Sequence, residues 1–96
     1  MKYIVKIEYC PGCKWLNRAS WFAQELLTTF EKELEGVTIA PAKQSGDFNI
    51  FLNEELIFSR KENGGFIDIA PLKRMLRDKI APEKSLGHTD KKKEND

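Results

Sequence analysis

The sequence is poor in the side chains that usually support chemistry, with two cysteines, one histidine and two methionines among 96 residues. Two cysteines are too few for the disulfide framework of a small secreted domain. No apolar run approaches the roughly 18 residues that a transmembrane helix needs. Residues 1–8 are too short and too charged to form the apolar core of a signal peptide. We therefore expect a cytoplasmic protein with no membrane partner.

An excess of charge of either sign is also missing. Lys and Arg total 16 and Asp and Glu total 15, so the formal net charge is +1. This balance argues against electrostatic binding to nucleic acid. The length fits one domain with a single core. Half of residues 81–96 are charged and Leu86 is their only large apolar side chain. We predict a domain over residues 1–80 and a charged, disordered C-terminal tail over residues 81–96.

Apolar periodicity predicts the secondary structure. Residues 3–9 alternate apolar and polar side chains, which is typical of a strand. A stripe with spacings of three and four predicts a helix over residues 13–35, with Gly36 closing it. The other expected elements are strands at 37–40, 48–52 and 56–60, a turn at 61–65, and a helix that Asp68 caps and Pro82 ends.

The expected element order is β-α-β-β-β-α, which favours an α/β two-layer sandwich. The long helix returns the chain so that the second strand lies parallel to the first. The third and fourth strands form an antiparallel hairpin. The sheet is then mixed and four-stranded, with both helices covering it.

The two cysteines, Cys10 and Cys13, are placed between the first strand and the predicted helix. Unpaired N–H groups and the positive end of the helix dipole would lower a thiol pKa there, below its free value of about 8.5. Two thiols at this spacing can also close an intramolecular disulfide, which allows a two-electron exchange cycle. Zinc normally needs four ligands and only the distant His88 remains, so we expect no metal within one chain. A metal bridging two chains and a pair of inert structural cysteines stay as alternatives.

Several residues are candidates for a substrate or partner surface around the pair. Trp15 follows the motif closely, although a tryptophan at helical spacing is commonly a core residue. Glycines in the expected loops let a backbone approach the site, although a plain turn role explains them as well. The full candidate set is Pro11, Gly12, Trp15, Ser45, Gly46, Phe48, Gly64 and Gly65.

These residues lie in segments that together resemble one family. The segments are Tyr9-Cys10-Pro11-Gly12-Cys13, residues 15–19, residues 45–50, residues 57–66 and residues 72–78. In combination they resemble the selenoprotein W-like (Rdx) proteins over about residues 3–80. The resemblance implies a thioredoxin-like fold and a thiol-based redox role. It also implies glutathione or protein thiols and disulfides as partners.

Two departures from related proteins bear on the mechanism. In selenocysteine-containing members the second position of the motif holds selenocysteine, whereas this chain has Cys13. That position points to Cys13 as the reactive atom, but the analogy with thioredoxins makes Cys10 the attacking thiol and Cys13 the resolving one, which we favour. Thioredoxins also place a cis-proline against the pair, whereas Pro41 precedes Phe48 by several residues. We therefore do not expect this chain to share the substrate groove of thioredoxins.

The leading hypothesis is a thiol–disulfide redox protein in which Cys10 and Cys13 cycle between dithiol and disulfide. The alternative is a redox-responsive binding adaptor on a thioredoxin-like scaffold, without turnover. We expect no bound cofactor, with glutathione as the candidate co-substrate. The aromatic residues leave a homodimer open.

Overall fold

The computed structural model describes residues 2–87. The chain divides into two compact units, one ending at Phe66 and one beginning at Ile67. The predicted boundary at residue 80 is a different division, and the predicted tail falls largely outside the described residues, His88 included. Each unit is described by itself below.

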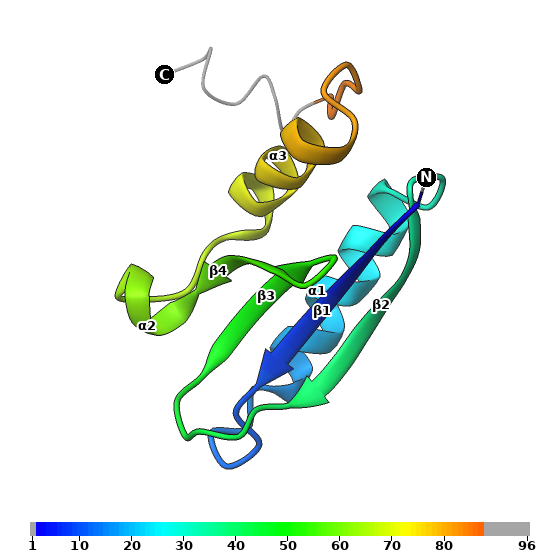
Figure 1. Ribbon diagram of the computed structural model, residues 1–96. Helices are drawn as coiled ribbons and strands as arrows, with labels where there is room; N and C mark the ends of the chain where they lie inside the picture. Colours follow the sequence, from blue (N-terminus) through cyan, green and yellow to red (C-terminus); the bar gives the residue numbers. More distant parts are fainter. Residues whose placement is uncertain (1, 88–96) are drawn as a thin grey trace. The chain divides into compact units, whose positions relative to one another are not determined.

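A four-stranded mixed sheet forms the framework of the first unit (Figure 1). Its strands are β1 (Tyr3–Tyr9), β2 (Leu34–Pro41), β3 (Phe48–Leu52) and β4 (Glu55–Ser59), in the order β2-β1-β3-β4. β1 pairs with β2 in parallel, and β3 pairs with β1 and β4 antiparallel. These pairings confirm the predicted crossover and the predicted hairpin. Both were predictable because short connections between neighbouring elements allow few other topologies.

The helix α1 (Leu16–Thr29) makes the crossover between the two parallel strands. Its buried residues are Ala19, Phe22, Ala23 and Leu26, as the apolar stripe predicted. Val5, Ile7 and Ile50 from the sheet have no exposed surface. These apolar side chains form the core that fixes the end of β1 relative to the start of α1.

The predicted helix limits, 13 to 35, are wrong at both ends. The helix ends at Thr29, and the N–H of its C-cap residue Phe30 donates to the carbonyl of Leu26. β2 then begins at Leu34 and includes Gly36, which lies opposite Ile4. Phe30 and Leu34 are both buried, at 0% and 4% exposure. The apolar spacing of the helix therefore continues through Phe30 and Leu34, and this pattern predicted one further helical turn where the chain forms a turn and the start of β2.

The chain after β3 turns through Asn53 and Glu54, whose φ angles are 48° and 76°. Positive φ at both central residues is the geometry of a type I′ hairpin turn. A one-turn helix, α2 (Arg60–Asn63), follows β4 where only a turn was predicted. The Ser59 side chain accepts a hydrogen bond from the Glu62 N–H and so caps it.

The second unit contains the helix α3 (Ile69–Ile80), which Asp68 precedes as its N-cap. Leu72 and Leu76 are its buried residues. After the helix, the Arg77 guanidinium donates to the Lys84 carbonyl at 2.7 Å. Within residues 2–87, no helix is long and apolar enough to cross a membrane.

Candidate redox site

Cys10 and Cys13 are joined by a disulfide in the connection between β1 and α1. Their Cα atoms are 5.3 Å apart. The Lys14 N–H donates to the Pro11 carbonyl at 3.0 Å, and Lys14 has a φ of 64°. Left-handed backbone is uncommon for lysine, so the turn is closed in a conformation that few residues adopt. The pair therefore lies in a tight turn of its own.

The turn changes the predicted electrostatics of the sulfurs. α1 begins at Leu16, after its N-cap residue Trp15, so Cys13 precedes the helix. A nearer donor is present, because the Cys13 N–H points to the Cys10 sulfur at 3.2 Å. A hydrogen bond to a sulfur stabilises negative charge on it. In the disulfide form, the donor at the Cys10 sulfur is therefore this backbone N–H and not the first turn of α1.

The two sulfur-bearing residues differ in their access to solvent. Cys10 is 2% exposed, whereas Cys13 is partly exposed. Pro11 and Gly12 between them are exposed. A partner approaching this turn therefore meets Pro11, Gly12 and Cys13, with Cys10 behind them.

An aromatic cluster of Trp15, Phe48 and Phe66 adjoins the turn. The Trp15 ring centroid lies 4.8 Å from that of Phe66 and 6.4 Å from that of Phe48. Phe48 and Phe66 are 5.3 Å apart, and Phe22 of α1 packs 5.8 Å from Phe48. All four contacts are edge-to-face, the favoured geometry for aromatic rings. Phe48 is 0% exposed, so it supports the cluster from the core and is not itself available to a partner.

Two arginines stack on this aromatic cluster. The Arg18 guanidinium carbon lies 3.9 Å from the Phe66 centroid. The Arg60 guanidinium carbon lies 4.6 Å from the Trp15 centroid and 5.2 Å from that of Phe66. These two guanidinium groups, the arginine pair, are within cation–π distance of a shared ring.

The loop between β2 and β3 also contacts Arg60. The Gly46 carbonyl accepts a hydrogen bond from Arg60 Nη1 at 3.3 Å. Gly46 has a φ of 84°, which a glycine adopts without strain. Asp47 beside it pairs with Lys61 at 2.8 Å. The predicted loop residue Ser45 is exposed.

The predicted glycines after α2 position Phe66. Gly64 has a φ of 78°, and its N–H and that of Gly65 both donate to the Arg60 carbonyl, at 2.9 and 3.1 Å. The chain thus turns back directly above Arg60 and places Phe66 against Trp15. This observation gives the two glycines a structural reason beyond a generic turn.

Sequence reasoning did not select Arg18, Arg60 and Phe66 as site residues. Arg18 follows Trp15 by three positions, which places both on one side of a helix turn. Arg60 and Phe66 come from segments far from the motif, so only the three-dimensional contacts unite them with Trp15. The spacing of three between Trp15 and Arg18 is therefore the one feature of the sequence that could have indicated this cluster.

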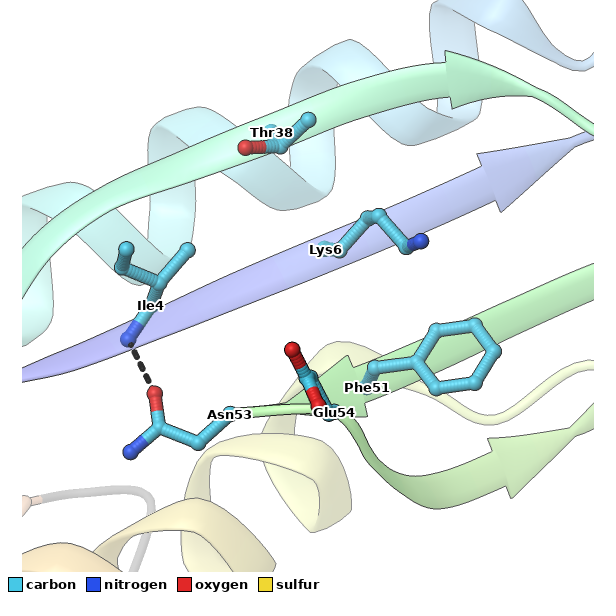
Figure 2. A pocket seen from close by; sticks show the side chains of 6 residues that line it. All are labelled: Ile4, Lys6, Thr38, Phe51, Asn53 and Glu54. Carbon is cyan, nitrogen blue, oxygen red and sulfur yellow. Dashed lines mark hydrogen bonds between the residues drawn. The ribbon is translucent and has the colours of Figure 1, made fainter.

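A hollow separate from the redox turn lies on the sheet face opposite α1 (Figure 2). It has a volume of about 610 Å³ and is lined by Ile4, Lys6, Thr38, Phe51, Asn53 and Glu54. The Asn53 side-chain oxygen accepts from the Ile4 N–H at 2.9 Å, and Lys6 lies 5.1 Å from the Phe51 ring centroid. Its β1 residues belong to the first half of the strand, away from the cysteines. Among residues 2–87, no group of three or more metal-ligating side chains gathers there or elsewhere.

Comparison with known proteins gives consistent matches. The model of the Rdx family matches residues 4–78. A crystal structure of a selenoprotein W-related protein from Vibrio cholerae is 42% identical, with a TM-score of 0.77 over 81% of this chain and 96% of that one. A crystal structure of a protein from Bordetella parapertussis is 39% identical, with a TM-score of 0.79 over 83% of this chain and 100% of that one. No curated protein is significantly similar to the chain.

Proposed function

This chain belongs to the Rdx family, and from that premise we propose that it is a thiol–disulfide redox protein whose Cys10 and Cys13 cycle between dithiol and disulfide. The observation that supports this most directly is the disulfide between the two, placed in an exposed turn beside an aromatic and cationic surface. The thioredoxin-like fold of the solved relatives agrees with it.

The proposed cycle consists of two thiol–disulfide exchange steps. A thiolate of the reduced pair attacks a partner disulfide, forms a mixed disulfide and releases the first partner thiolate. The second cysteine thiolate then attacks the protein sulfur of the mixed disulfide. This step closes the Cys10–Cys13 bond and releases the second partner thiolate. The pair has lost two electrons and two protons, which two thiols of glutathione or of a protein restore by the reverse exchange.

We propose that Cys13 attacks and Cys10 resolves, the reverse of the order favoured by the thioredoxin analogy. A disulfide must approach the attacking sulfur in line, and Cys13 is the more exposed of the two. Cys10 is 2% exposed, but it lies within reach of Cys13 and accepts a hydrogen bond from the Cys13 N–H. A buried thiolate with a fixed donor suits the intramolecular resolving step.

The test uses two variants, each of which leaves a single thiol in the chain. Wild-type protein should reduce a model disulfide catalytically in a glutathione-coupled assay, and both Cys10→Ser and Cys13→Ser should lose that turnover. The Cys10→Ser variant should still form a stable mixed disulfide through Cys13. The Cys13→Ser variant should do so much more slowly.

Alkylation by iodoacetamide at pH 7 checks the order of attack independently. In the reduced wild-type protein, Cys13 should be labelled before Cys10, as read by peptide mass spectrometry. Faster labelling of Cys10 would contradict the proposed order. Absence of turnover together with unchanged partner binding in both variants would favour the redox-responsive adaptor instead.

A further inference from the structure

We propose that Arg18 and Arg60 form a carboxylate-binding site that selects redox partners with a carboxylate close to the reacting sulfur. This inference rests on the proposed thiol–disulfide function and names the class of partner that the site prefers. The arginine pair would bind the carboxylate while the exposed turn presents Cys13 to the partner's sulfur.

Two positively charged groups lie against the ring of Phe66. Both guanidinium groups are within 5.2 Å of the Phe66 centroid, at 3.9 and 5.2 Å. Two positive charges are thus held on one aromatic ring, and their fields add at an anion that binds beside it. Within the described residues, neither arginine has an ion-pair partner, and the nearby Asp47 is paired with Lys61.

Arg60 also has unused hydrogen-bonding capacity. Arginine has five N–H donors in a planar fork that matches a carboxylate. The Nε of Arg60 is buried and has no partner among residues 2–87, while Nη1 makes one long bond to Gly46. A buried polar group without a partner needs an explanation. Arg60 is partly exposed and Arg18 is exposed, so a bound carboxylate can accept from the N–H groups of either guanidinium that the protein leaves without a partner.

The start of α1 carries basic side chains and no acidic ones. Helix N-termini favour acidic side chains and a hydrogen-bonding cap. α1 has neither, and it places Arg18 in its first turn, after the exposed Lys14. Local rules broken in this way are typical of functional sites. Positive charges at this end of a helix are unfavourable for the helix dipole, but they favour the binding of an anionic ligand.

The aromatic cluster that carries the two arginines is connected to the cysteine turn through the backbone. Trp15, on which Arg60 stacks, follows Cys13 by two residues, and its N–H donates to the Cys10 carbonyl at 3.5 Å. Phe48 pairs with Tyr9, the residue before Cys10. The aromatic cluster thus adjoins the redox turn by two backbone connections. A carboxylate there belongs to the same partner molecule as the reacting sulfur, either glutathione or an acidic residue beside a protein cysteine.

Binding is tested without any redox step. Oxidised protein is titrated with S-methylglutathione and with its diethyl ester, while the arginine Nε–H signals are followed by ¹⁵N NMR. The acid should shift the Arg18 and Arg60 signals in a saturable way, and the ester should bind about five- to tenfold more weakly, because charge-assisted pairs are the strong ones. Equal binding of acid and ester, or arginine signals that do not move, would overturn the inference.

The variants are chosen for safe folding. Arg18→Gln changes an exposed side chain, and Lys32→Gln removes the same charge from an exposed residue after the other end of α1. Arg18→Gln should weaken binding of the acid about fivefold and leave the ester unchanged. Lys32→Gln should change neither by more than about twofold. Equal effects of both variants would mean that only net charge matters and would refute a specific site.

A kinetic arm distinguishes the two sources of the carboxylate. Reduction of oxidised glutathione is compared with its ethyl ester, and a cystine peptide with Glu beside Cys is compared with its Gln counterpart. If the wild type reduces the acid of either pair faster than its neutral counterpart, and Arg18→Gln removes that difference, the site is supported. The pair that shows the difference identifies the source of the carboxylate. No discrimination in either pair refutes it. A wild type that reduces no disulfide yet binds the acid selectively would sink the proposed redox function and leave the carboxylate site standing.

Discussion

Cys10 and Cys13 are three positions apart and differ in exposure, and that difference decides which sulfur a partner can reach. Cys10 directly follows β1 and is buried, whereas Cys13 follows two exposed residues of the turn and is partly exposed. Sequence identified the pair and its place after a strand. It could not show which sulfur is buried, because the burial of a turn residue depends on how the rest of the chain packs around it.

Phe48 is the residue on which the aromatic cluster depends most. It is 0% exposed and contacts Trp15, Phe22 and Phe66. Phe48→Ala should lower the free energy of unfolding by about 3–5 kcal/mol through lost burial and a residual cavity. Urea denaturation, monitored by circular dichroism, measures this loss in the free energy of unfolding.

The matched control for this prediction is Leu27→Ala on the exposed face of α1. Leu27 is 40% exposed, and alanine is a good helix former. The control should change stability by less than about 1 kcal/mol. A similar loss in both variants would mean that the cluster contributes no more than a surface side chain.

At the scale of elements, the strands were predictable and the helix limits were not. Alternation in β1 and β3 has a period of two that no helix shares. The stripe of α1 continued into Phe30 and Leu34, because the turn and the next strand are buried against the same core. Burial alone therefore cannot locate a helix end. Gly36, expected as a cap, instead pairs with Ile4 in the sheet.

The hairpin between β3 and β4 depends on Asn53 for two separate reasons. Its φ of 48° is left-handed, and its side chain accepts from the Ile4 N–H of β1. Asn53→Gly keeps the backbone freedom and loses the hydrogen bond, whereas Asn53→Ala loses both. We expect Asn53→Ala to cost about 1–2 kcal/mol of unfolding free energy, and Asn53→Gly less.

Thermal and urea unfolding of the two Asn53 variants checks this order. Equal losses would show that only the hydrogen bond to Ile4 matters. A larger loss in Asn53→Gly would contradict the turn argument, because glycine adopts positive φ without strain.

At the scale of the whole molecule, topology brings the site together from four separate segments. The parallel crossover and the hairpin were predictable, since both follow from strand patterns and short connections. The meeting of Arg18, Arg60 and Phe66 was not, because no local pattern specifies which side chains face each other across 48 residues of chain. Contacts of this kind depend on strand register and on loop geometry together.

The disulfide itself should add little to global stability. It closes a loop with a sequence separation of 3, and the chain-entropy model gives about 2 kcal/mol for so short a loop. Urea denaturation of oxidised and reduced protein should therefore differ by no more than about that amount. A much larger difference would indicate a structural staple, because a strongly stabilising bond resists reduction.

The central claim is that Cys10 and Cys13 exchange between dithiol and disulfide in the folded protein. Equilibration in glutathione buffers of graded ratio, followed by acid quench and intact mass spectrometry, tests it most directly. We predict one two-electron transition between a form with two alkylatable thiols and a form with none, at a poise that glutathione can reach. Failure of the intramolecular Cys10–Cys13 disulfide to form at any poise would contradict the claim.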